Sequence, residues 1–320
     1  MINILITIPV TDAQLEKMKA VCPEGCFRRV TQQELNADVV RDAEVIIGNI
    51  PKDLVASCEK LRLLQLSMAG SDGWAELMPK GVLLANSSGA FGLAISEHML
   101  AEVLTIKKKL YLYHENQHES LWRDEGGVTS IEDAYVLSVG MGDIGGEFTR
   151  KCKALGAYTV GIRRTVREKP DYVDEMHTLE ELDGLLPKAD VVALSLPSGQ
   201  GTIGLMDERR LRLMKSGAIL LNVGRGNAIV TDDLVKVCSE GHIYAALDVT
   251  YPEPLPADHP LWQTKNVFIT PHISGFFHLP QTLQRIVGIG TENLRRFMNG
   301  EPLLNLVDAA TGYRAQSNRA

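Results

Sequence analysis

Three glycines near the middle of the chain constrain its fold more than any other feature. Gly140, Gly142 and Gly145 directly follow the apolar stretch 134–139 and have the spacing G-x-G-x-x-G. This pattern is typical of a strand that ends in a tight turn and leads into a helix whose N-terminus faces bound phosphates. We expect the strand to end at Gly140 and a helix over residues 147–155. The pattern favours a dinucleotide ligand, and an ordinary glycine-rich turn is the alternative.

Composition and charge indicate a globular protein with small-molecule partners. The chain has 320 residues, 45% of them hydrophobic, which is enough for two cores. Its net charge of -7 argues against a nucleic-acid partner or an anionic membrane surface. Residues 1–10 resemble a first strand rather than a leader, so we expect a cytoplasmic protein with no membrane partner. The five cysteines lack zinc-site spacing, so we expect reduced thiols and no metal.

The N-terminal part of the chain has the pattern of a small α/β unit. Short apolar runs alternate with helix-like stretches at residues 12–21 and 31–37. A periodic segment at 99–113 follows and predicts one long helix that connects two domains. The strands expected in this part are 4–8, 45–47, 63–66 and 82–84.

Beyond a polar loop at 123–130, the chain alternates strands and helices again. The pattern predicts a doubly wound parallel sheet, followed by a last helix at 281–298 and an irregular tail. The six strands expected in this sheet are 134–139, 157–162, 191–194, 218–222, 244–248 and 267–269.

Four further motifs follow the glycine turn in a fixed order. They are Leu-Ser-Leu-Pro at 194–197, Asn-Val-Gly-Arg-Gly-Asn-Ala-Ile-Val at 222–230, Ala-Leu-Asp-Val-Thr-Tyr-Pro-Glu-Pro-Leu-Pro at 246–256 and Thr-Pro-His-Ile-Ser-Gly at 270–275. Together with the turn they resemble the D-isomer-specific 2-hydroxyacid dehydrogenases, from Leu63 to the last helix. This resemblance implies two Rossmann-like α/β domains with doubly wound parallel sheets. The nucleotide domain would be inserted into a smaller, flavodoxin-like substrate domain.

The domain boundaries follow from the same resemblance. We expect residues 98–292 to form the NAD(P)-binding domain. Residues 1–97, completed by 293–320, would form the substrate-binding, catalytic domain.

The resemblance assigns the family's conserved Arg, Glu and His to Arg225, Glu253 and His272. A guanidinium can hold the carboxylate of a 2-oxo acid and polarise its carbonyl group, because its donors form a planar fork. Histidine suits the protonation of the nascent alkoxide, since imidazole titrates near neutral pH. A glutamate bonded to the other ring nitrogen would fix the tautomer and favour the protonated ring. For Arg225 the alternative is a surface arginine in a salt bridge.

The resemblance also implies substrate and cofactor contacts. Ala69 and Gly70 would lie in a loop whose backbone amides grip the substrate carboxylate, unless the loop is an ordinary turn. Arg225 and His272 complete the substrate contacts. Asp248 would lie near the nicotinamide carboxamide. The expected cofactor contacts are Gly140, Gly142, Asp143, Ile144, Gly145, Arg163, Arg164, Thr165, Leu196, Pro197, Val223, Gly224, Arg225, Asp248, His272, Ser274 and Gly275.

The end of the second strand of the nucleotide domain bears on the choice of cofactor. An NAD-binding unit usually has an acidic residue there, which accepts hydrogen bonds from the adenosine ribose. This chain has Arg163, Arg164 and Thr165 instead. Two guanidiniums and a hydroxyl suit a 2'-phosphate, so we predict NADP(H) in preference to NAD(H). The alternative is a solvated basic turn.

These expectations combine into a predicted activity. The chain would be a homodimeric enzyme, with its interface near residues 97–113, that reduces a small 2-oxo acid of the glyoxylate or hydroxypyruvate type to the D-2-hydroxy acid with NAD(P)H. One alternative is a dehydrogenase for a bulkier branched or aromatic 2-oxo acid. Another is a non-catalytic, NAD(P)H-sensing, corepressor-like protein. The presence of Arg225, Glu253 and His272 favours an enzyme.

Overall fold

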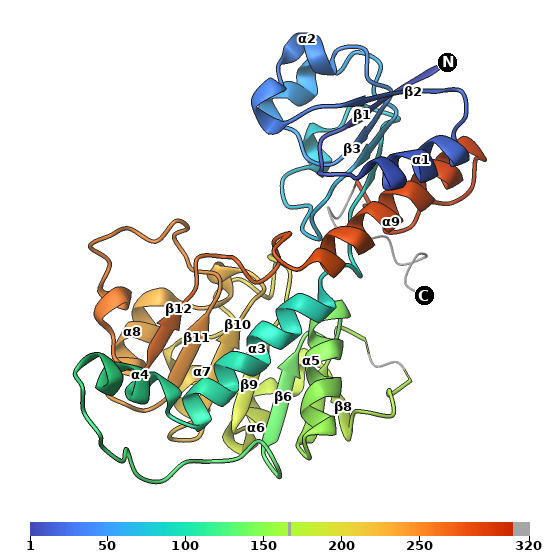
Figure 1. Ribbon diagram of the computed structural model, residues 1–320. Helices are drawn as coiled ribbons and strands as arrows, with labels where there is room; N and C mark the ends of the chain where they lie inside the picture. The colour runs from blue at the N-terminus through green and yellow to red at the C-terminus, as the bar shows by residue number, and fades with distance from the viewer. Residues whose placement is uncertain (166–167, 310–320) are drawn as a thin grey trace. The chain divides into compact units, whose positions relative to one another are not determined.

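Two parallel β-sheets organise the protein, one in each of two units (Figure 1). The computed structural model describes residues 1–165 and 168–309. Unit 1 consists of residues 1–90 together with the chain from Phe277 onward, and unit 2 consists of residues 91–276. Unit 2 is therefore an insertion within unit 1.

Unit 1 contains a five-stranded sheet in the order β2-β1-β3-β4-β5, and every strand pair is parallel. This is the flavodoxin-like order, with the strand order reversing beside β1. The middle strands are buried apolar segments, whereas the edge strand β2 is mostly exposed. The strands are β1 (Ile2–Ile6), β2 (Gly25–Arg29), β3 (Val45–Ile47), β4 (Leu63–Gln65) and β5 (Leu83–Ala85).

Helices from both ends of the chain cover this sheet. The first helix, α1 (Asp12–Val21), begins at a capping box in which Thr11 and Gln14 bond reciprocally. The long helix α9 (Pro280–Met298) packs against α1 and β4, and Figure 1 shows α1 and α9 side by side. A short helix α2 (Ala37–Val40) and 3-10 turns at Gln32–Glu34, Lys52–Ser57 and Ala75–Leu77 complete the unit.

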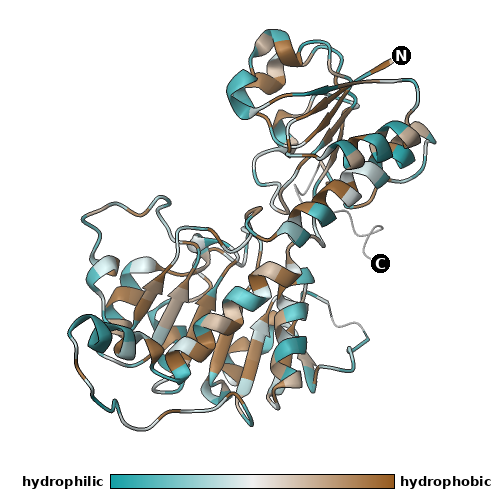
Figure 2. Cartoon of the chain, in the orientation of Figure 1, coloured by the Kyte–Doolittle hydropathy of each residue, from teal (hydrophilic) through white to brown (hydrophobic). Residues whose placement is uncertain are grey.

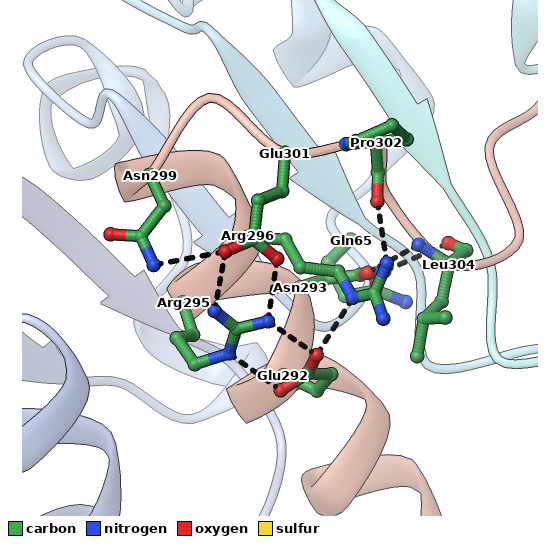
Figure 3. Close-up of polar contacts among 9 residues, drawn as sticks. All are labelled: Gln65, Glu292, Asn293, Arg295, Arg296, Asn299, Glu301, Pro302 and Leu304. Carbon is green, nitrogen blue, oxygen red and sulfur yellow. Dashed lines mark hydrogen bonds and ion pairs between the residues drawn. The ribbon is translucent and has the colours of Figure 1, made fainter.

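Polar contacts fasten the end of α9 to the chain that follows it (Figure 3). Glu292 accepts from Arg295 and Arg296, and Arg295 also forms an ion pair with Glu301. The buried amide of Asn293 donates to Gln65 Oε1 at 2.6 Å and to the Leu304 carbonyl at 2.9 Å. We call these contacts the α9 clamp, because they join α9, β4 and the tail.

The tail continues along the edge of the sheet. The Val307 N–H donates to the Leu84 carbonyl at 2.8 Å, and Leu306 forms an antiparallel bridge with Ala85 of β5. Residues 303 and 307 are buried apolar side chains. The tail therefore belongs to the core of unit 1 as far as it is described.

Unit 2 contains a seven-stranded parallel sheet in the order β12-β11-β10-β9-β6-β7-β8. Its central strands β9 and β10 are buried along their whole length and mostly apolar, as expected for a parallel sheet covered on both faces. In Figure 2 these strands are mostly brown, the colour of hydrophobic residues. The strands are β6 (Tyr135–Val139), β7 (Tyr158–Ile162), β8 (Glu175–His177), β9 (Val191–Leu194), β10 (Ile219–Asn222), β11 (Tyr244–Leu247) and β12 (Val267–Ile269).

Helices surround the second sheet, and α3 and α5 pack against each other along their lengths (Figure 1). The helices are α3 (Gly92–Lys107), α4 (Leu110–His118), α5 (Asp143–Ala154), α6 (Leu182–Leu185), α7 (Glu208–Leu213) and α8 (Thr231–Ser239). None of the helices in the described part of the chain is long and apolar enough to cross a membrane.

Several predicted elements need correction. The single helix expected at 99–113 is wrong, because α3 ends at Lys107 and Lys109 adopts a left-handed φ of 55° before α4 begins. The helix expected at 147–155 already begins at Asp143. The helix expected at 31–37 is a 3-10 turn at Gln32–Glu34, and the short helix α2 begins only at Ala37. The edge strands β2 and β8 were not predicted, since neither contains an apolar run.

The unit boundaries also differ from the predicted domain boundaries. They lie after Ala90 and after Phe276, whereas we predicted them after residues 97 and 292. The first differs because all of α3 belongs to unit 2, where it packs on α5. The second differs because all of α9 belongs to unit 1, where it packs on α1 and β4.

Candidate functional site

The glycine turn has the geometry of a phosphate-binding loop. Gly140 has a φ of 104°, and a Cβ placed on Gly145 would collide with the Gly140 carbonyl oxygen. A side chain would therefore disrupt the turn at either position. Gly142 caps α5 without a side chain, and a Cβ there would meet nothing within 4 Å. The first turn of α5 thus presents backbone N–H groups beside an open space, which fits the pyrophosphate of a dinucleotide.

The next two residues enter α5 with different environments. The side chain of Asp143 accepts a hydrogen bond from the Gly92 N–H at 2.7 Å, while Ile144 is half-buried. The Asp143 carboxylate therefore has a protein partner, and its backbone N–H remains the group suited to a phosphate.

The three residues predicted to recognise a 2'-phosphate follow β7. Arg163 donates through Nε and Nη2 to the Met141 carbonyl oxygen, at 3.2 Å and 2.9 Å, which fastens its guanidinium to the glycine turn. Arg164 and Thr165 are exposed. These three positions hold no acidic residue, so an NAD ribose would find no carboxylate acceptor in them.

The loops after β9 and β10 complete the cofactor side. Ser195 Oγ donates to the Gly140 carbonyl at 2.8 Å, which joins the loop after β9 to the glycine turn. Leu196 is half-buried and Pro197 exposed next to it. Val223 and Gly224 follow β10, and the Gly224 N–H donates to Asn222 Oδ1 at 3.1 Å. The loops after β6, β9 and β10 thus lie at one edge of the sheet, the carboxyl edge.

Arg225 projects from the same edge of the sheet. Asn222 Nδ2 donates to the Arg225 carbonyl at 2.9 Å, and Arg225 Nη1 donates to the Gly224 carbonyl at 2.8 Å. A Cβ on Gly226 would overlap the backbone of Thr250, so the Arg225 turn packs directly on the loop after β11. This close approach brings the loop of Arg225 next to the loop that leads to Glu253.

Glu253 and His272 form a hydrogen-bonded pair. His272 Nδ1 lies 2.6 Å from Glu253 Oε1, and the two side chains are 49% and 41% exposed. His272 has a φ of 54°, a left-handed conformation that is strained for a residue with a Cβ. The bond through Nδ1 leaves Nε2, on the opposite side of the ring, as the atom that can exchange a proton with a substrate.

Asp248 shapes the loop that carries His272. The residue is 3% exposed, and Oδ1 accepts from Thr270 Oγ1 at 2.6 Å and from the Ile273 N–H at 3.0 Å. Oδ2 accepts from the Ser274 N–H at 3.2 Å and also from the Ser274 hydroxyl. The Asp248 carboxylate therefore binds the chain on both sides of His272. Its predicted contact with the nicotinamide stays a prediction.

Three other residues of the predicted site are Gly275, which belongs to unit 2, and Ala69 and Gly70, which belong to unit 1. A Cβ on Gly275 would lie 3.1 Å from Ile95 Cδ1, so the chain passes close to α3 there. Ala69 and Gly70 belong to the loop after β4 in unit 1, where Asn86 Nδ2 donates to the Ala69 carbonyl at 2.8 Å. Both residues are half-buried. Their predicted grip on a carboxylate stays a prediction.

Sequence reasoning missed one group of residues beside the site. His98 on α3 lies 3.2 Å from Thr270 Oγ1 through its Nε2 atom, although 172 positions separate the two residues. Glu102 Oε1, one turn further along α3, lies 3.9 Å from the same nitrogen. A pairing over such a separation leaves no periodic signal in one sequence, and His98 alone looks like any helix histidine. In the described residues no group of three or more potential metal ligands occurs.

Comparisons with known proteins agree with this architecture. The family model described as "D-isomer specific 2-hydroxyacid dehydrogenase, NAD binding domain" matches residues 100–274. The hydroxypyruvate reductase of Blautia hydrogenotrophica is 28% identical over 287 residues, which cover 86% of this chain and 88% of that protein.

Two solved structures extend the similarity over both units. A D-isomer specific 2-hydroxyacid dehydrogenase family protein from Aeromonas salmonicida subsp. salmonicida A449 has a TM-score of 0.86 at 31% identity, covering 96% of this chain and 99% of that chain. A D-isomer specific 2-hydroxyacid dehydrogenase from Xanthobacter autotrophicus Py2, in complex with NADPH and MES, has a TM-score of 0.80 at 27% identity, covering 97% and 99%. With a matching family model over more than half its length and these relatives over nearly all of it, the chain belongs to the D-isomer-specific 2-hydroxyacid dehydrogenase family.

Proposed function

We propose that this protein reduces a small 2-oxo acid, of the glyoxylate or hydroxypyruvate type, to the D-2-hydroxy acid with NADPH. The observation that carries the proposal is the 2.6 Å pair of His272 Nδ1 and Glu253 Oε1 at the carboxyl edge of a sheet with a dinucleotide-binding turn. The relative in Blautia is named hydroxypyruvate reductase, which supports this substrate class.

The pair supplies the proton in this reaction. Glu253 accepts the hydrogen on Nδ1, which fixes the tautomer and the orientation of the His272 ring. The Nε2 hydrogen then passes to the oxygen of the former carbonyl as it gains negative charge. When bound, the nicotinamide supplies the hydride. One 2-oxo acid, one NADPH and one proton thus yield one hydroxy acid and one NADP⁺.

Arg225 is proposed to hold the substrate carboxylate and polarise the carbonyl. Its turn is fixed by the Asn222 side chain and by the packing of Gly226 on Thr250. A fixed guanidinium matches a carboxylate with two parallel donors, so it can set which face of the carbonyl is presented.

The proposal of NADPH over NADH rests on the end of β7. Arg163 is fastened to the glycine turn, and Arg164 and Thr165 are exposed beside it. Charge-assisted bonds to a 2'-phosphate would stabilise NADP(H) there. The Xanthobacter relative in complex with NADPH supports the same choice.

We also propose a homodimer whose interface includes residues 110–128, which are α4 and the loop that follows it. Trp122 is fully exposed, and Leu110, Leu121 and Val128 are exposed apolar residues of the same segment. Exposed apolar side chains gathered in one stretch are typical of an interaction surface. Light scattering after gel filtration tests this: Trp122→Ser should shift a dimer toward monomer, and a monomeric wild-type protein would contradict it.

Initial rates decide the function. The purified protein is assayed with NADPH against glyoxylate, hydroxypyruvate, pyruvate, phenylpyruvate and 2-oxoisocaproate, with His272→Gln as the inactive control. We expect the highest kcat/KM with glyoxylate or hydroxypyruvate. The highest kcat/KM with phenylpyruvate or 2-oxoisocaproate would instead identify a dehydrogenase for bulkier acids. NADPH binding without turnover of any acid would identify a sensor.

A further inference from the structure

A chain of hydrogen bonds connects α3 to the loop that carries His272. His98 Nε2 lies 3.2 Å from Thr270 Oγ1, which in turn lies 2.6 Å from Asp248 Oδ1. All three residues belong to unit 2. None of the three is part of the proton-donating pair, and His98 and Thr270 have no role in the mechanism above.

The direction of each bond follows from counting hydrogens. A threonine hydroxyl has one hydrogen to donate, and the carboxylate of Asp248 can only accept. Thr270 therefore donates to Asp248, and His98 must donate its Nε2 hydrogen to Thr270. Glu102 is the more distant acceptor for this hydrogen, at 3.9 Å. The tautomer of His98 is thus set, and the chain runs from His98 through Thr270 to Asp248.

The end of this chain determines the backbone around His272. Asp248 accepts hydrogen bonds from residues on both sides of His272, namely Thr270 and Ile273. The His272 N–H donates to the Thr270 carbonyl at 2.9 Å, which closes a tight turn. A left-handed backbone at a residue with a Cβ persists only where its surroundings hold it. Thr270 supplies two of these restraints, one through its hydroxyl and one through its carbonyl.

We propose that His98 and Thr270 are positioning residues for His272, which act through Asp248 to hold the imidazole in the orientation required for proton transfer. The role of His272 as proton donor rests on the function proposed above. The positioning itself is a property of the protein that can be measured without turnover.

Conservative variants of Thr270 separate positioning from packing. Thr270→Val keeps the shape of the side chain and removes the hydroxyl, whereas Thr270→Ser keeps the hydroxyl. We expect Thr270→Val to lower kcat by about 10- to 100-fold with KM for the 2-oxo acid unchanged, because the proton donor is misplaced while binding is retained. Thr270→Ser should recover most of kcat. His98→Leu should resemble Thr270→Val, and His98→Gln, which retains an N–H donor, should be intermediate.

Thr264→Val is the matched control. Like Thr270, Thr264 is a threonine of unit 2 whose hydroxyl donates a hydrogen bond, in this case to the Pro260 carbonyl at 3.0 Å; Thr264 is buried, whereas Thr270 is half-buried. This variant should lose stability as Thr270→Val does, with no change in kcat. If Thr270→Val and Thr264→Val both retain kcat, the positioning role is refuted.

Spectroscopy tests the positioning independently of activity. In ¹⁵N-histidine-labelled protein, the Nδ1–H proton of His272, bonded to Glu253, is assigned by its loss in His272→Gln. Its resonance should move in Thr270→Val and His98→Leu and stay in place in Thr264→Val. An unmoved resonance in the first two variants would overturn the proposal. If the wild-type protein reduces no 2-oxo acid, the function proposed above fails, and this resonance still decides the positioning role.

Discussion

The carboxylate of Asp143, the first residue of α5, accepts a hydrogen bond from the backbone N–H of Gly92, the first residue of α3, at 2.7 Å. The N-cap residue of α3 itself, Phe91, makes no capping hydrogen bond with its side chain. Asp143 therefore caps a neighbouring helix and fixes the relative position of two helix N-termini, one of which carries the proposed phosphate site.

This contact predicts that the Asp143 side chain stabilises the fold but does not strengthen cofactor binding. Asp143→Ala should lower the free energy of unfolding by about 0.5–2 kcal/mol, the usual value of an N-cap. It should not weaken NADPH binding, because it removes a negative charge near the phosphates. Urea unfolding measures the free energy of unfolding, and titration with NADPH measures the affinity for the cofactor. A weaker affinity for NADPH in Asp143→Ala would show instead that the side chain contacts the cofactor.

The His272–Glu253 pair predicts a graded loss of activity. His272→Gln should reduce kcat by about 10²–10⁴-fold, since the general acid is lost. Glu253→Gln should reduce kcat less, because a glutamine side-chain oxygen can still accept the hydrogen on His272 Nδ1 but carries no charge. Stopped-flow rates with saturating NADPH measure both. His242→Gln is the control. His242 lies just before β11, at the opposite edge of the sheet from His272, and its Nε2 atom bonds to the Met214 carbonyl. Full activity of His272→Gln would remove this residue from the mechanism.

The two arginines after β7 predict how cofactor preference responds to charge. Arg164→Ala should raise KM for NADPH and leave KM for NADH unchanged, because only NADPH carries the 2'-phosphate. Arg163→Asp should shift the ratio of kcat/KM values toward NADH. Each variant is compared with both cofactors, so NADH serves as the internal control. A wild-type preference for NADH, or equal losses with both cofactors, would contradict the phosphate site.

The α9 clamp predicts a dependence of the stability of unit 1 on pH (Figure 3). Arg295 and Arg296 lower the pKa of Glu292 from 4.5 to about 2, chiefly through the hydrogen bond from Arg295. A folded pKa below the unfolded one means that the clamp stabilises unit 1 fully above pH 4.5. This stabilisation is lost as the pH falls toward 2. Glu292→Gln should therefore lower stability at pH 6 and have little effect near pH 2.

A tryptophan probe makes this experiment specific for unit 1. Of the three tryptophans, Trp74 is buried in unit 1, whereas Trp122 and Trp262 belong to unit 2. Urea unfolding followed by fluorescence in a Trp122→Phe/Trp262→Phe background reports on unit 1. Glu16→Gln is the control, since its ion pair with Lys19 on α1 is exposed and should contribute little at either pH. Equal effects of Glu292→Gln at pH 6 and near pH 2 would contradict the clamp.

The sequence predicted the parts of the fold that are built from continuous apolar runs. The strands β6, β9 and β10 were found because both faces of a parallel sheet are buried. The edge strands β2 and β8 were missed, since an edge strand needs few apolar residues. The break between α3 and α4 was also missed, because the turn at Lys109 contains neither glycine nor proline.

The candidate site shows the same limit. Ordered motifs identified Glu253 and His272, which the structure brings within hydrogen-bonding distance. The bond of Thr270 to His98 was not foreseeable, because it depends on how α3 packs against the sheet. The side-chain partner of Asp143 was missed for the same reason. Local patterns thus identify the residues, while packing decides their partners.

The insertion of unit 2 within unit 1 also sets an order of events during synthesis. Residues 1–90 leave the ribosome first, but unit 1 also requires α9, and the buried Gln65 must wait for Asn293, 228 positions later. Unit 2 is contiguous and can fold as soon as it has been translated. The first strands of unit 1 therefore remain without α9 until unit 2 has been synthesised.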